Sequence, residues 1–253
     1  MIPSQERNTN HDAIASIYDL KSPLERHDIV LECIDKLILK NIPEEAHIFD
    51  LGCGTGQVAQ RLIKRGYQVT GLDSSEAMLN IARENAPNAE FILDDARYFK
   101  LPPTFHAVIS TDVVLNYILS TEELENAFQN VYDALLENGI FAFELYLEEL
   151  CESNWKNNES GGGVKDDNVW VDIWSYDQNI KIGRKDTTRF ELINGNWQRL
   201  DRSFFLKAYS AAEVKIALEK VGFTEINIYD INRDLEVKKA SETACIICHK
   251  PQI

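Results

Sequence analysis

The stretch His47-Ile48-Phe49-Asp50-Leu51-Gly52-Cys53-Gly54-Thr55-Gly56 decides which fold this chain adopts. Its apolar side chains predict a short buried strand, and its three glycines at alternating positions predict a tight turn with positive φ angles. From Gln57 onward the apolar residues have helical spacing. A turn of this kind presents backbone N–H groups and the positive end of a helix to a ligand.

After this turn, strand-like and helical segments continue to alternate through the first 150 residues. Further strands are expected at Tyr67–Asp73, Glu90–Asp95, Phe105–Thr111 and Ile140–Tyr146. Ser120 and Glu123 have capping-box spacing ahead of a helix that Gly139 is expected to end. Regular alternation of this kind predicts a doubly wound α/β sheet.

The pattern changes after residue 150. Residues 157–163 contain three consecutive glycines and predict a flexible linker. The next segments alternate polar and apolar residues, and Asn194-Gly195 between two of them is typical of a two-residue hairpin turn. We therefore expect an antiparallel β insertion over residues 151–208, following a first core part over residues 1–150.

The α/β pattern resumes over residues 209–253. Ser210 and Glu213 form a second capping-box pattern ahead of a helix that Gly222 ends. Thr224–Tyr229 and Thr243–His249 are strand-like, and the short connection between them predicts an antiparallel pair. Together with the five earlier strands they complete a seven-stranded sheet.

Composition and charge limit the classes of partner. The 253 residues include 41 acidic and 26 basic ones, for a net charge of −15. Such a chain repels phosphate backbones, so a nucleic-acid partner is disfavoured and a neutral or cationic small molecule is favoured. No apolar run approaches the roughly 18 residues of a membrane span. Five scattered cysteines indicate reduced thiols, and hence a cytoplasmic protein.

The spacing of the glycines separates two kinds of nucleotide site. In the dinucleotide fingerprint the third glycine follows the second by three residues, whereas here Gly56 follows Gly54 by two. The string Asp50-Leu-Gly52-Cys53-Gly54-Thr-Gly56 strongly resembles motif I of class I S-adenosylmethionine (SAM)-dependent methyltransferases. The resemblance implies a seven-stranded Rossmann-like core and SAM as the cofactor.

Acidic residues at the ends of the next two strands extend this resemblance. Asp73 can accept hydrogen bonds from both ribose hydroxyls, although enzymes that bind NAD share this feature. Asp95 and Ala96 resemble the pair that binds adenine, with Asp94 as the competing assignment. The cofactor-binding residues that the resemblance implies are Asp50, Gly52, Cys53, Gly54, Gly56, Asp73, Ser74, Met78, Asp95, Ala96 and Thr111.

Four residues are candidates for the catalytic side of the site. Tyr18, followed by Asp19, resembles the Ala-x-x-Tyr-Asp pattern of small-molecule methyltransferases, in which the tyrosine faces the transferred methyl; the alternative is a core tyrosine on an amphipathic helix. Asn116 and Tyr117 match the region after the fourth strand. Some relatives have an aspartate three residues before that pair, where this chain has Val113, with Asp112 one position earlier.

Three other features have ordinary explanations. Cys245-Ile-Ile-Cys248-His249 matches the c-type haem attachment pattern, but on a strand the two sulfurs point to opposite faces. His106 is expected to be structural rather than a base. The aromatic and basic residues of the insertion could line a pocket or form its core: Trp170, Trp174, Tyr176, Arg189 and Arg202. No cluster suggests a metal site.

These features predict a SAM-dependent methyltransferase that acts at N or O of a small molecule, similar to amino-sugar N-methyltransferases that carry a β insertion. We expect a monomer or a homodimer without membrane contact. The alternatives are a tRNA or protein methyltransferase, and a SAM-binding regulatory protein without catalysis.

Overall fold

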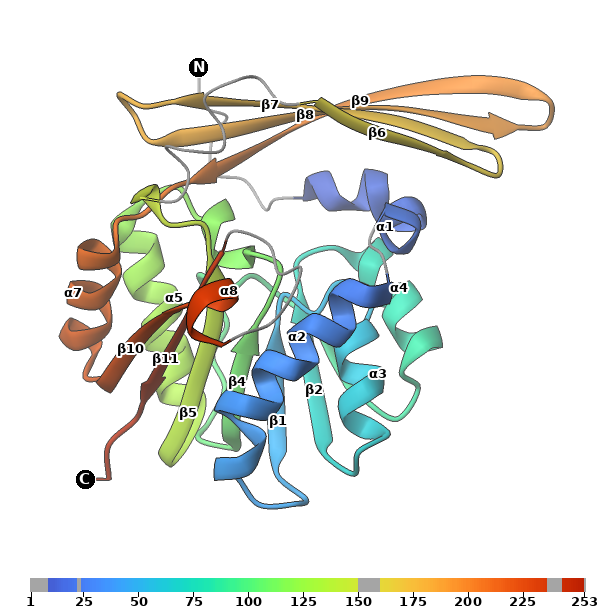
Figure 1. Ribbon diagram of the computed structural model, residues 1–253. Helices are drawn as coiled ribbons and strands as arrows, with labels where there is room; N and C mark the ends of the chain where they lie inside the picture. The colour runs from blue at the N-terminus through green and yellow to red at the C-terminus, as the bar shows by residue number, and fades with distance from the viewer. Residues whose placement is uncertain (1–8, 22–23, 150–159, 236–242, 253) are drawn as a thin grey trace.

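The computed structural model describes residues 9–21, 24–149, 160–235 and 243–252, and its main sheet has the strand order β10-β11-β5-β4-β1-β2-β3 (Figure 1). These strands are β1 (His47–Leu51), β2 (Gln68–Asp73), β3 (Glu90–Leu93), β4 (Phe105–Ser110), β5 (Leu135–Leu145), β10 (Thr224–Asp230) and β11 (Ala244–His249). The first five are parallel, and β11 runs antiparallel to both β5 and β10. The predicted Rossmann-like sheet and its terminal antiparallel pair are confirmed.

Helices cover both faces of this sheet (Figure 1). On one face lie α2 (Leu24–Leu37), α3 (Gln57–Ile63) and α4 (Glu76–Asn85), and on the other lie α5 (Thr121–Ala134) and α7 (Ala211–Val221). The shorter helices are η1 (Thr9–Ile14), α1 (Ala15–Lys21), η2 (Leu39–Asn41), η3 (Val114–Tyr117) and α8 (Ile231–Asp234). Central strands buried on both faces explain the nearly continuous apolar runs in the sequence.

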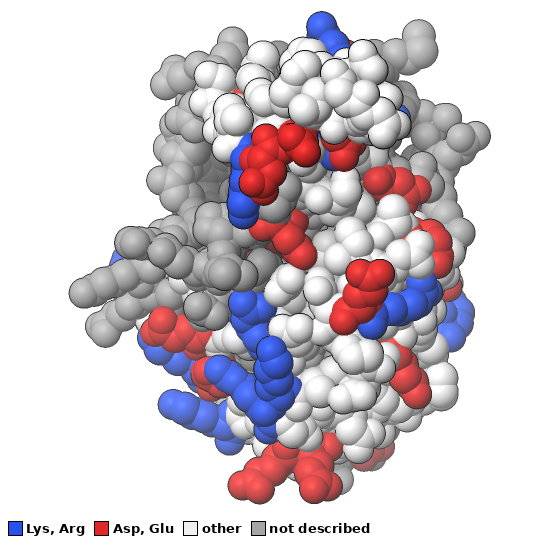
Figure 2. All heavy atoms as spheres, turned by 90° about the vertical axis from the view of Figure 1, so that its right-hand side faces the viewer, with Lys and Arg blue, Asp and Glu red and all other residues white. Residues whose placement is uncertain are grey.

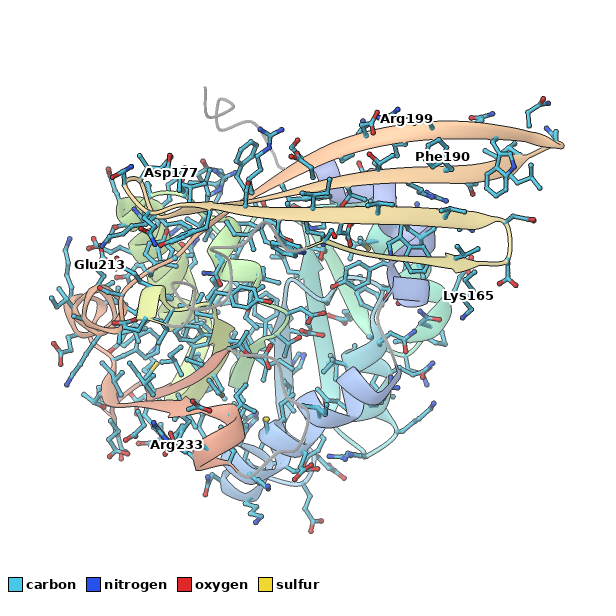
Figure 3. The ribbon with its side chains drawn as sticks, turned by 45° about the horizontal axis from the view of Figure 1, so that its top comes forward. Lys165, Asp177, Phe190, Arg199, Glu213 and Arg233 are labelled. Carbon is cyan, nitrogen blue, oxygen red and sulfur yellow. The ribbon has the colours of Figure 1, made fainter. Side chains whose placement is uncertain are left out.

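The insertion forms a separate four-stranded antiparallel sheet that lies across the carboxyl ends of the parallel strands (Figure 1). Its strands are β6 (Ser160–Lys165), β7 (Asn168–Asp177), β8 (Ile182–Ile193) and β9 (Asn196–Lys207). Asn194 and Gly195 both have positive φ, of 51° and 77°, as the predicted hairpin turn requires. Figure 3 shows Phe190 and Arg199 on the long hairpin β8–β9, where the guanidinium carbon lies 5.9 Å from the ring centroid.

The predicted linker over residues 157–163 is wrong for its second half. Ser160 to Gly163 pair with β7 as the first residues of β6, while residues 157–159 lie outside the described chain. A Cβ added to Gly163 would overlap the indole ring of Trp170 on the neighbouring strand. Gly163 therefore makes room for a large side chain, and the glycines lie in a paired strand and not in a linker.

The expected end of the helix before β5 is also wrong. α5 ends at Ala134, and Leu135 already pairs with Phe105 of β4. The register then shifts before Ile140, across Asn138 with a φ of 60° and Gly139, so this glycine lies within an irregular part of the strand. At the other end of α5, Ser120 caps the Glu123 N–H, but the Glu123 carboxylate binds Arg97, so only half of the predicted capping box forms.

The surface agrees with the acidic composition. On the face shown in Figure 2, acidic side chains lie among the basic ones, and the described part of the insertion at the top is mostly uncharged. Most of the basic side chains on this face gather at the lower left, below the insertion. None of the described helices combines the length and apolar character needed to cross a bilayer.

Candidate functional site

The glycine turn between β1 and α3 has the predicted geometry. Gly52, Gly54 and Gly56 have φ angles of 79°, 52° and 74°, which other residues rarely adopt. A Cβ at Gly52 would lie 2.5 Å from the Val114 side chain, whereas one at Gly54 would meet only the Tyr18 ring, at 3.9 Å. The backbone at Gly54 is therefore open to close approach by a ligand.

Asp73 fixes this turn to the end of β2. Its Oδ2 accepts the Gly54 N–H at 2.9 Å and its Oδ1 accepts the Ser75 N–H at 2.9 Å. Burial raises the pKa of Asp73, and these N–H groups oppose that rise. Ser74 lies between Asp73 and Ser75 in the chain. The buried Met78 follows in the first turn of α4.

Asp50 lies at the end of β1, between the strands that end near Asp73 and Asp112. Its side chain is fully buried, and neither carboxylate oxygen has a hydrogen-bond partner in the described structure. Burial, followed by the charges of Asp73 and Asp112, raises the pKa of Asp50 to about 7. A buried carboxylate without partners is costly for a folded protein, which points to an absent ligand.

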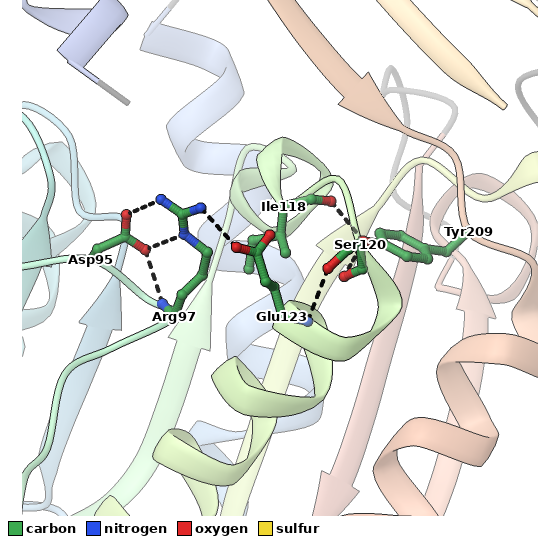
Figure 4. A network of polar contacts seen from close by, with 6 residues as sticks. All are labelled: Asp95, Arg97, Ile118, Ser120, Glu123 and Tyr209. Atoms are coloured by element: carbon green, nitrogen blue, oxygen red, sulfur yellow. Dashed lines mark hydrogen bonds and ion pairs between the residues drawn. The ribbon is translucent and has the colours of Figure 1, made fainter. Parts of the chain in front are cut away.

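The end of β3 carries a buried ionic network that includes the predicted Asp95 (Figure 4). The Arg97 guanidinium donates to both carboxylate oxygens of Asp95, from Nε at 2.9 Å and from Nη2 at 2.7 Å. Its remaining nitrogen, Nη1, pairs with Glu123 Oε1 at 3.1 Å. These contacts raise the pKa of Arg97. Ala96 accepts a hydrogen bond from Asn130 through its carbonyl. Sequence reasoning missed Arg97, although its place two residues after Asp95 was a usable signal.

Tyr18 and Asp112 meet above the turn. The Tyr18 hydroxyl donates to Asp112 Oδ2 at 2.9 Å, and the Asp112 N–H donates to Glu144 Oε2 at 3.1 Å. Asp112 and Val113 have φ angles of 57° and 55°, an unfavourable conformation for non-glycine residues. This strained turn directs the Asp112 carboxylate toward Tyr18. It does so although Asp112 lies one position before Val113, where some relatives have their aspartate.

The two remaining catalytic candidates differ in their surroundings. The fully buried Asn116 amide donates to the carbonyls of Tyr146 and Lys207 and accepts the Tyr146 N–H, so its hydrogen bonds fix backbone and point to a structural role. The Tyr117 ring packs edge-on against His11, with centroids 4.9 Å apart. Burial, with Asp112 as the next cause, raises the pKa of Tyr117 and keeps its hydroxyl protonated.

The N-terminal segment closes over the turn through two aspartates that sequence reasoning did not place in the site. Asp19 accepts from the Thr55 hydroxyl at 2.6 Å and from the Gln57 amide at 3.0 Å. Asp12 accepts from the Ser75 hydroxyl at 2.5 Å. These contacts join residues more than 30 positions apart, which local patterns in a sequence do not reveal.

Thr111 and Glu144 also line a small recess between α2 and the ends of β4 and β5. Cys33 and Cys245 border the same recess. Burial raises the pKa of both thiols, which keeps them protonated and unreactive.

The competing motifs have structural explanations. His106 Nδ1 accepts the His47 N–H at 3.1 Å, as expected for a structural histidine. Cys245 and Cys248 are buried in different hydrophobic clusters, on opposite faces of β11. In the described chain, no group of three or more His, Cys, Asp or Glu side chains is arranged to hold a metal ion. Trp174 and Tyr176 pack on the cluster that contains Phe204.

Comparison with known proteins shows a match to a methyltransferase domain. A family model described as a methyltransferase domain matches residues 48–139. YqeM of Bacillus subtilis (strain 168) is 28% identical over 201 residues, covering 74% of this chain and 77% of that protein. A dTDP-3-amino-3,4,6-trideoxy-alpha-D-glucopyranose N,N-dimethyltransferase of Streptomyces venezuelae is 33% identical over 144 residues, covering 56% of this chain and 61% of that protein.

A solved structure has the same fold. SAM-bound CalS10, an amino pentose methyltransferase from Micromonospora echinaspora, superposes with a TM-score of 0.73 at 18% identity, covering 94% of this chain and 96% of that one. Residues 48–139 therefore match the methyltransferase-domain family, and the fold of the chain is that of a SAM-bound methyltransferase. SAM is also the cofactor that the resemblance to motif I predicted.

The residues present fit this cofactor. SAM is cationic, and the buried carboxylate of Asp50 has no partner in the described structure. The open backbone at Gly54 gives the ligand a surface to approach.

Proposed function

We propose that this methyltransferase acts on nitrogen or oxygen of a small molecule that lies between Tyr18, Asp112 and the inner face of the β insertion. The observation that carries this proposal is the 2.9 Å hydrogen bond from the Tyr18 hydroxyl to Asp112, placed directly above the glycine turn. It brings a carboxylate and a phenol to the carboxyl ends of β1 and β4, where ligands bind in open α/β sheets.

In this proposal the cofactor lies along the carboxyl ends of the parallel strands. Asp73 binds the ribose hydroxyls, while Asp95 and the Ala96 backbone bind adenine. Arg97 holds the Asp95 carboxylate in a fixed orientation through two hydrogen bonds. The turn from Gly52 to Gly56, including Cys53, contacts the remainder of SAM together with Asp50, while Ser74, Met78 and Thr111 border it.

The bound cofactor supplies an electrophilic methyl group on its sulfonium. The protein contributes mainly alignment, an effect that can lower the barrier by about 7–11 kcal/mol. Asp112 accepts the proton that the acceptor nitrogen or oxygen loses, and Tyr18 orients this carboxylate through its hydroxyl. Tyr117, protonated and buried, shapes the wall of the acceptor site. Asn116 is a positioning residue in this proposal.

The relatives support a small acceptor. The Streptomyces venezuelae protein is named as an enzyme that dimethylates an amino sugar nucleotide, and CalS10 is described as an amino pentose methyltransferase. The acidic composition favours such an acceptor over tRNA. Four buried free thiols in the described chain support a reducing, cytoplasmic environment.

Two experiments test this function. Calorimetric titration with SAM, S-adenosylhomocysteine and NADH is expected to show binding of the first two only; tight NADH binding without SAM binding would contradict the cofactor assignment. Incubation with extract and labelled SAM, followed by mass identification of the product, is expected to give a labelled small molecule. Label found only in RNA or protein would support a tRNA or protein methyltransferase. Label in no product would support a SAM-binding regulatory protein without catalysis.

A further inference from the structure

His11 lies where the N-terminal segment, the core and the insertion meet. It belongs to η1, and its ring packs against Tyr117 of η3, with centroids 4.9 Å apart, and against Phe204 of β9, at 5.1 Å. Phe204 shares a hydrophobic cluster with Ile14 and Ile17 of the N-terminal segment, so it lies on the face of the insertion that is turned toward the core. His11 therefore joins two walls of the proposed acceptor site.

The ring nitrogens of His11 have no hydrogen-bond partner among the described residues. Other histidines of the chain use theirs: His47 Nε2 lies 2.9 Å from the Thr70 hydroxyl, and His106 Nδ1 accepts the His47 N–H. The His11 side chain is only half-buried, so a ligand can reach it. An imidazole that is held by ring packing, with both nitrogens unused, is suited to binding a polar group of a ligand.

The surroundings keep this imidazole neutral. Lys185 of β8 lies over the rings of Trp174 and Phe204, with its Nζ 5.1 and 5.6 Å from their centroids. Burial, followed by the positive charge of Lys185, lowers the pKa of His11 to about 4, although Asp12 opposes the change. At neutral pH His11 therefore offers one N–H and one lone pair, where a protonated imidazole offers only two N–H groups.

We propose that His11 is a specificity-determining residue, which holds the acceptor by accepting a hydrogen bond from a hydroxyl or amino group next to the atom that is methylated. This inference rests on the proposed function, because it requires an acceptor between the core and the insertion. Asp112 takes the proton of the attacking atom there, so the group that His11 holds is a second one. The acceptor is accordingly a small molecule with at least two polar groups.

Two substitutions separate the hydrogen bond of His11 from its packing. His11→Phe keeps a flat ring against Tyr117 and Phe204 and removes both nitrogens. His11→Gln loses the ring but keeps an oxygen that accepts hydrogen bonds. His249→Phe is the matched control, because this half-buried histidine ends β11 and lies beside Glu225 of β10.

The first measurement compares acceptor binding with the maximal rate. The probe is the extract fraction that takes up label from SAM, diluted in steps at saturating SAM. In His11→Phe we expect half-maximal rate to require roughly tenfold more of this fraction, while the maximal rate falls less than about threefold. His11→Gln is expected to lie within about threefold of the wild type on both measures. The control keeps wild-type values, and SAM affinity by calorimetry is unchanged in all variants.

The second measurement uses NMR of the unaltered protein with 15N-labelled histidine rings, so it does not depend on whether a variant folds. The His11 signals are assigned as those that disappear in His11→Gln or His11→Phe. At neutral pH we expect one protonated and one unprotonated nitrogen. Adding the same extract fraction with S-adenosylhomocysteine, which blocks turnover, should move the signal of the unprotonated nitrogen and leave the signals of His106 and His249 in place.

The outcomes separate this inference from the proposed function. Unchanged half-saturation in His11→Phe, or a loss confined to the maximal rate, overturns acceptor binding by His11. Weaker SAM binding in His11→Phe also overturns it, because the residue then supports the cofactor site. His11 signals that stay in place when the fraction is added overturn it independently. Failure of SAM-bound wild-type protein to label any small molecule contradicts the proposed function itself, and this inference with it.

Discussion

The amide N–H of Gly54 donates to Oδ2 of Asp73 at 2.9 Å, so the residue proposed to bind the ribose also holds the turn that approaches the cofactor. A substitution at Asp73 therefore removes a ligand contact and loosens the turn together. We expect Asp73→Ala to weaken SAM binding by roughly tenfold or more, as measured by calorimetry. Asp133→Ala is the control, and unchanged affinity in Asp73→Ala would remove this residue from the site.

Asp19 links the N-terminal helix to the turn through Thr55 and Gln57. We expect Asp19→Ala to free this helix, so that SAM dissociates about tenfold faster in stopped-flow experiments and residues 9–21 are cleaved more readily by protease. Asp35→Ala removes an exposed aspartate that pairs with Arg65, and it should leave both rates unchanged. An Asp19 variant with the wild-type dissociation rate would show that the helix does not retain the cofactor.

The ligand-free protein should lose stability as the pH rises toward neutrality. Asp50 has a pKa of about 7 when folded, against about 3.9 when unfolded, so between these values the folded state holds the extra proton. The unfolding free energy therefore falls with rising pH over this interval and levels off above about pH 7. In Asp50→Asn this contribution is absent, so its melting temperature should change less between about pH 5 and about pH 8. An identical pH dependence in both proteins would contradict the raised pKa.

Arg97 should be important for stability as well as for adenine binding. Its side chain is 9% exposed, and it pairs with Asp95 and Glu123, at 11% and 13%. Removing it takes the guanidinium partner away from two largely buried carboxylates, so we expect Arg97→Ala to cost about 3–5 kcal/mol in urea unfolding. Arg199→Ala breaks a pair whose members are 62% and 55% exposed, and should cost under about 1 kcal/mol. Similar costs for both variants would show that the buried network contributes little.

Much of the methyltransferase-like part of the fold could be predicted from local patterns in the sequence. The spacing of the three glycines and the acids at the strand ends depend only on neighbouring residues, which is why the sheet, the turn and the class of cofactor could be predicted. The hairpin at Asn194-Gly195 is a further example, because its turn chemistry is confined to two residues.

The predictions were wrong or incomplete where a residue's structure depends on a side chain far away in the sequence. The run of glycines at 161–163 looks flexible until the Trp170 ring is placed against Gly163. Arg97 and Asp12 have no motif of their own, and Asp19 belongs to a motif that does not reveal its partners; all three act through residues of other elements. The Asp112 carboxylate reaches Tyr18 through a left-handed turn, and no residue pattern in the chain announces that conformation.

The amide of Asn116 binds the backbone of Tyr146, just after β5, and of Lys207, at the end of β9. These are the two points where the chain leaves the core for the insertion and returns to it. One side chain thus joins the residue that follows β5 to the last residue of β9. Such an attachment makes the insertion an exchangeable module: evolution, or a protein engineer, can replace the segment between these two points to recruit new acceptors without rebuilding the methyl-donor half of the enzyme.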